Sequence, residues 1–255
     1  MFSPRLCSCL VSRRVLFRRV WLRPISQLVV ATALTSSLLA GAVWAEPNES
    51  EGPPITRWIA EAEEYALRGR YDNALPLYEK AIAALAQDRP QQHRLRYRYG
   101  IILNALGGQR PDLYPLARSQ FESVLAYVES SPAIPFEHSA ARVRSALAHT
   151  YHQQSASESD IHRRTQLLHS AYQLYAAARV QLKEEKDWQN LAITYFNLGQ
   201  VCEWQGNLEE AIEWLEEAVA LDRRHGFDDL EEDLAYLTAL REQVNPTQPT
   251  GNTRI

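Results

Sequence analysis

The residues best suited to metal chemistry are four histidines in the middle of the chain, His149, His152, His162 and His169. The first two lie three residues apart, which puts both on one face of a helix, and Glu158 follows them. Imidazole and carboxylate groups are common zinc ligands. No carboxylate occupies a regular ligand spacing beside the histidines, so we interpret them as solvated surface residues and predict no bound metal.

Paired acids are abundant, as in EEAIEWLEEA and DDLEEDL. Two carboxylates at a fixed separation in a cleft could serve acid–base catalysis, but on the outer face of a helix they are solvated. The sequence has no Gly-rich phosphate loop, HExxH, CxxC or GxSxG motif, and no local pattern builds a Ser-His-Asp triad. We therefore predict no catalytic activity and no cofactor. An enzyme or metal protein built around the histidines is the last alternative.

Helices must position all of these side chains. Ala, Leu, Glu, Gln and Arg dominate the sequence, glycine is sparse at 10 residues, and no strand-like alternation recurs. Hydrophobic residues at 45% and charged residues at 23% are globular values. The composition predicts an all-α protein with a buried core.

The clearest internal pattern is NLGQVCEWQGNLEEAIEWLEEAVALD, residues 197–222, in which small and apolar residues recur three and four apart on either side of a Gly-Asn turn. This order resembles the tetratricopeptide repeat, W-x₂-L-G-x₂-Y followed by A-x₃-F. Tyr195 stands for the Trp, Cys202 for the Tyr and Leu215 for the Phe, while Arg223 replaces the usual final Pro.

Three similar copies precede this one. The small residue of the first helix recurs at Ala62, Gly100, Ala148 and Gly199, and the spacings of 38, 48 and 51 residues exceed the family period of about 34. The excess falls in the Pro-rich QRPDLYP and in SASESDIHRRT, which either forms a loop or lengthens the second helix. Pro76 predicts a late helix start or a kink in the first copy.

The resemblance implies a right-handed α-solenoid of about four tetratricopeptide-like hairpins plus a C-terminal capping helix. The expected segments are a leader at 1–45, a linker at 46–55, a repeat domain at 56–244 and a disordered tail at 245–255. Within the repeat domain we expect hairpins near 56–88, 94–131, 138–186 and 190–224, and a cap at 228–244.

The leader holds six arginines and no acid before the apolar run 25–43. Small residues at Val43 and Ala45 predict a signal peptide cleaved after Ala45, so that the protein is exported to a periplasm, a lumen or the exterior. An uncleaved membrane anchor at 25–43 and an organellar transit peptide are the alternatives. The segment SRRVLFR resembles a twin-arginine export signal, although an ordinary basic region before the apolar run also explains it.

Cleavage would remove six positive charges and take the net charge from −4 to −10. So acidic a surface repels a phosphate backbone, which argues against nucleic-acid binding. Cys202 would remain as a lone cysteine on an apolar helix face, where it is expected to be a small buried residue without a disulfide partner.

In tetratricopeptide arrays the first helix of each hairpin lines an inner groove that binds peptides. The resemblance implies groove residues in the second, third and fourth hairpins, in chain order Arg94, Tyr97, Asn104, Arg142, His149, His152, Phe196, Gln200 and Trp204. Arginine beside aromatic rings suits an extended peptide that carries carboxylates. Alternatively, the aromatic residues pack between hairpins and the two arginines are ordinary surface residues.

The members of this family that clamp a C-terminal carboxylate use Lys and Asn on successive first helices. The matching positions here include Ile59, Glu63 and Ile101, so that chemistry is missing. The sequence as a whole predicts a non-catalytic adaptor or assembly factor that binds a protein or peptide. A membrane-tethered or self-associating scaffold is the alternative.

Overall fold

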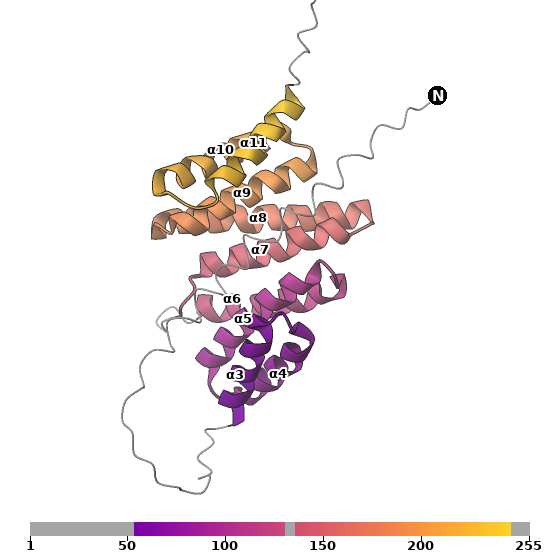
Figure 1. The fold of residues 1–255 in the computed structure, drawn as a ribbon, viewed down its shortest axis with the longest axis vertical. Helices are drawn as coiled ribbons and strands as arrows, with labels where there is room; N and C mark the ends of the chain where they lie inside the picture. Colours follow the sequence, from indigo (N-terminus) through magenta and orange to yellow (C-terminus); the bar gives the residue numbers. More distant parts are fainter. Residues whose placement is uncertain (1–53, 131–135, 246–255) are drawn as a thin grey trace, which may run out of the picture. The chain divides into compact units, whose positions relative to one another are not determined.

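The computed structural model describes residues 54–130 and 136–245. The unit that ends at Ala84 contains helices α3 (Pro54–Leu67) and α4 (Tyr71–Ala84). The unit that begins at Leu85 contains α5 (Arg89–Gly107), the 3₁₀-helix η1 (Pro111–Leu113), α6 (Tyr114–Ser130), α7 (Ala140–Ser157), α8 (Ile161–Glu185), α9 (Trp188–Gln205), α10 (Leu208–His225) and α11 (Leu230–Val244) (Figure 1).

Helices that are consecutive in sequence pack against each other within each unit. In the first unit α3 packs on α4, and in the second each helix from α5 to α11 packs on the next. Helices α5 and α7 also touch, as do α7 and α9, and we call these three the first-helix row. The residues that the structure describes contain no strand, so the predicted all-α, solenoid type of fold is confirmed.

Side-chain caps and left-handed residues mark where the helices begin and end. The Asp160 carboxylate accepts hydrogen bonds from the backbone N–H groups of His162 and Arg163 at 2.8 and 3.0 Å, and this starts α8. Gly206 ends α9 with a φ of +88°, a conformation that glycine adopts without steric cost. The extra residues of the third copy are therefore largely helical, since α8 has 25 residues.

The observed helix limits differ from the approximate expected ones in three places. Pro54 and Ile55, placed in the linker, already belong to α3, and α5 begins at Arg89 instead of near residue 94. Helix α4 begins at Tyr71, well before Pro76, so the proline does not delay the start of the helix. The leader, the rest of the linker and residues 246–255 lie outside the described part of the chain.

Close approach of paired helices depends on small residues. A Cβ atom added to Gly199 would lie 2.7 Å from Cγ of Leu215 and 3.0 Å from the Ala211 carbonyl oxygen, so only glycine fits between α9 and α10 here. Cys202 is fully buried, as expected, in an apolar cluster with Leu237 and Leu240 of α11. Among residues 54–130 and 136–245, no helix is long and apolar enough to cross a membrane.

Candidate functional site

The first part of the candidate site lies around Tyr97 on α5. The Tyr97 ring stacks on the His138 ring with centroids 3.9 Å apart, and it meets the Phe121 ring edge-on at 5.6 Å. Burial raises the pKa of Tyr97, and the nearby charge of Arg142 on α7 opposes that rise. Tyr97 therefore stays neutral and works as an aromatic contact between helices.

Glu137, just before α7, shares this neighbourhood. The hydrogen bond with His138 lowers the pKa of Glu137, burial opposes this decrease, and the charges of Arg98 and Arg94 lower the pKa further. Arg94 is exposed. The structure thus brings Arg94, Tyr97 and Arg142, from two helices, into one electrostatic neighbourhood.

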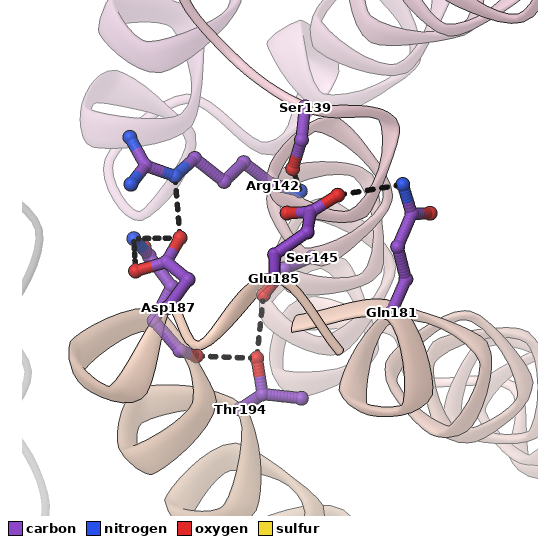
Figure 2. Close-up of polar contacts among 8 residues, drawn as sticks. Ser139, Arg142, Ser145, Gln181, Glu185, Asp187 and Thr194 are labelled. Atoms are coloured by element: carbon purple, nitrogen blue, oxygen red, sulfur yellow. Dashed lines mark hydrogen bonds and ion pairs between the residues drawn. The ribbon is translucent and has the colours of Figure 1, made fainter. Parts of the chain in front are cut away.

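Arg142 is also engaged with the start of α9. Its Nε donates to Oδ2 of Asp187 at 2.5 Å, and the side-chain amide of Asn190 donates to the two oxygens of Asp187 at 3.0 and 2.9 Å. Figure 2 shows this ion pair beside the hydrogen bond of 3.1 Å between the hydroxyls of Ser145 and Thr194. Arg142 keeps 39% of its side chain exposed while Asp187 keeps 12%, so the arginine joins α7 to α9 and still reaches the surface.

The interpretation of the histidines as surface residues is wrong for His152. This side chain is fully buried, its ring centroid lies 4.4 Å from that of Trp204, and neither ring nitrogen has a hydrogen-bond partner among the described residues. Burial lowers the pKa of His152 to about 3, and the charge of His149 acts in the same direction. His162 and His169, by contrast, are exposed as expected.

The other predicted groove residues differ in exposure. Gln200 is buried, and Asn104 is half-buried with both side-chain amide atoms enclosed. His149 is half-buried by surface area, and burial lowers its pKa to about 3. The Phe196 ring meets the Tyr236 ring of α11 at 5.2 Å. Arg94 and Arg142 are thus the charged candidates that reach the surface.

Three residues of this neighbourhood were missed in the sequence, namely Glu137, His138 and Asp187. Asp187 carried a usable signal, because an acid directly before an apolar-periodic segment is typical of a helix N-cap. Glu137 and His138 carried none, since they lie in an irregular segment and meet α5 only through tertiary packing. Within the described residues, no group of three His, Cys, Asp or Glu side chains could hold a metal ion.

Comparison with protein families gives two matches. Family models described as Tetratricopeptide repeat match residues 158–224 and residues 62–92. The first match covers α8 to α10 apart from the last residue of α10, and the second covers the C-terminal part of α3, all of α4 and the start of α5. No curated protein matches the chain. These matches show that the two matched segments are similar to tetratricopeptide repeats, and the packing of consecutive helices agrees with this similarity.

Proposed function

We propose that the protein is an exported, non-catalytic adaptor or assembly factor that binds a protein or peptide partner along the first-helix row. Tetratricopeptide repeats generally mediate protein–protein interaction, which supports the general class of function. The partner segment would run across α5, α7 and α9 and carry carboxylate groups.

The observation that carries this proposal is the neighbourhood of Arg94, Tyr97 and Arg142. Arg94 is exposed on α5, three residues before Tyr97, and Arg142 of α7 is 39% exposed and acts electrostatically on Tyr97. A guanidinium forms strong paired hydrogen bonds with a carboxylate, and Arg and Tyr are enriched among the residues that dominate binding energies. Glu137 and Asp187 lie beside these arginines, so a carboxylate of the partner would compete with them for the guanidinium groups.

Arg94→Glu is the sharper test of this site. Arg142→Glu would place a second carboxylate against Asp187 and disturb the contact between α7 and α9, so a loss of binding would be ambiguous. Arg94 is exposed, and its reversal should weaken partner binding about tenfold or more, the effect of roughly 1.4 kcal/mol. Partners captured from the native host with the wild-type chain would be titrated against both proteins at two salt concentrations, because an exposed charge pair weakens with salt.

Arg224→Glu provides the matched control. It makes the same charge change at an exposed position on α10, and it should leave both affinity and helical circular dichroism unchanged. Equal binding by the wild-type and Arg94→Glu chains would exclude this surface as the binding site.

Export is tested at the N-terminus. Cleavage after Ala45 predicts a mature chain that begins at Glu46, which intact-mass measurement of the protein from its native host would establish. A full-length chain recovered from membranes would instead favour the tethered scaffold.

A further inference from the structure

Two buried carboxyl groups meet at the junction of the last two helices. Asp222 lies in the last turn of α10 and Asp233 in the first turn of α11, and they are 2% and 6% exposed. Their side chains are hydrogen-bonded to each other. Because an ionised carboxylate can only accept a hydrogen bond, this contact requires a proton on one of the two groups.

No positive charge compensates the pair within the described residues. No described lysine, arginine or histidine forms an ion pair or hydrogen bond with either carboxyl group, and Oδ2 of Asp222 is buried without a nitrogen or hydroxyl donor. The charges that act on the pair from the connecting turn and from α11 are Asp229 and Glu232, which are both acids. Two uncompensated buried charges would be strongly unfavourable, so the pair holds a single proton.

The basic residues at the C-terminus of α10 do not pair with the two aspartates. Arg223 and Arg224 are exposed. His225 stacks on the Trp188 ring of α9 and on the Phe227 ring, with centroids 5.5 Å away in both cases. These residues leave the carboxyl pair without a counter-charge from α9 or α10.

The pair spans the turn that sets the direction of α11. The main-chain carbonyl of Asp222 accepts hydrogen bonds from the N–H groups of Gly226 and Phe227 at 2.8 and 3.0 Å, which ends α10. The N–H of Asp233 donates to the Asp229 carbonyl at 3.0 Å, within the first turn of α11. The side-chain bond between the two aspartates therefore ties the end of one helix to the start of the next.

We propose that a proton shared between Asp222 and Asp233 acts as a latch that holds α11 on α10, and that rising pH releases it. Beyond its first turn, α11 is held by Leu237 and Leu240 in the apolar cluster that includes Cys202. The Tyr236 hydroxyl also donates a hydrogen bond to Glu203 of α9, and Arg241 forms an ion pair with Glu216 of α10. Release of the first turn would therefore loosen the helix that covers this cluster.

The direction of the pH effect follows from the burial of the pair. Burial is the largest cause that raises the pKa of Asp233 from 3.8 to about 9, and the charge of Asp222 contributes to the same rise. Since the docked form keeps a proton that the released form loses, the latch is fully effective below about pH 4 and is lost as the pH rises through about 9.

The test is hydrogen exchange of the α11 amides in the full chain and in Asp233→Asn. The asparagine stays neutral at every pH, and its amide can donate to the Asp222 carboxylate. Comparison at the same pH removes the intrinsic pH dependence of exchange. The opening equilibrium of α11 in the wild type, relative to the variant, should rise about tenfold per pH unit between pH 6 and pH 8, as expected for one linked proton. A constant ratio would overturn the proposal.

Glu231→Gln is the matched control, because it removes one negative charge from the same helical turn at an exposed position. A plot of the α11 opening equilibrium against pH should run parallel for Glu231→Gln and the wild type. If Glu231→Gln instead follows Asp233→Asn, general charge repulsion and not a shared proton explains the pH effect. Carboxyl NMR titration of the wild type needs no variant to fold. One aspartate should titrate above pH 7, and titration of every aspartate below about pH 5 would also overturn the proposal.

Discussion

Replacing Phe121 with alanine is expected to lower the free energy of unfolding by about 3–5 kcal/mol. The ring is fully buried between α5 and α6 and meets Tyr97 edge-on. It sits directly over Gly100, where an added Cβ would lie 2.8 Å from the Phe121 Cζ atom. An alanine at position 121 leaves a cavity between α5 and α6, and α5 cannot fill this cavity without moving Tyr97.

The loss should first appear locally, because the stability of a repeat array is approximately a sum over neighbouring units. Urea unfolding followed by circular dichroism gives the total change, and amide exchange should rise first in α5 and α6. Ile161→Ala, at a side chain that is 66% exposed, is the control and should change stability by less than about 0.5 kcal/mol. A loss below about 1 kcal/mol for Phe121→Ala would mean that the neighbouring side chains refill the space.

Acid is expected to destabilise the protein through His152. Burial lowers its pKa to about 3, against 6.5 for the ordinary group. Between those values the unfolded chain binds a proton that the folded chain does not, so stability is present above pH 6.5 and falls as the pH decreases. One linked proton costs about 1.4 kcal/mol per pH unit, which gives about 3 kcal/mol at pH 4.

His152→Phe isolates this contribution from the titration of the carboxylates, which both proteins share. The ring contact with Trp204 can be kept, and the titrating group is gone. The difference in unfolding free energy between pH 7 and pH 4 should therefore shrink by up to about 3 kcal/mol in the variant. His169→Phe makes the same replacement at an exposed histidine and is the matched control. If the two variants behave alike, His152 is protonated in the folded protein at pH 4.

The two buried titratable sites work in opposite directions. His152 makes the chain less stable as the pH falls, and the Asp222–Asp233 pair makes the attachment of α11 less stable as the pH rises. The free energy of unfolding is therefore expected to be greatest at a pH between the acidic range in which His152 destabilises the chain and the alkaline range in which the aspartate pair loses its proton.

The local pattern of the sequence determined the helices. Spacings of three and four residues around Gly199, Cys202, Ala211 and Leu215 predicted an apolar face on each of two helices, and all four residues are buried. The Gly-Asn turn at Gly206 predicted a helix end because left-handed capping geometry depends on neighbouring residues alone. The length of α8 could not be chosen from the sequence, since polar residues before Leu168 fit a loop or an exposed helix equally well.

Tertiary packing decided what the polar residues of those helices do. Arg142 and His152 occupy the same first helix and looked alike in the sequence, yet the first reaches the surface and pairs with Asp187 while the second is enclosed beside Trp204. The proton shared by Asp222 and Asp233 also depends on tertiary packing. Each residue taken alone would be predicted from the sequence to be a solvated acid at a helix end. Periodicity gives the face of a helix on which a side chain lies. The charge, protonation and accessibility of that side chain depend on the groups that other helices place against it.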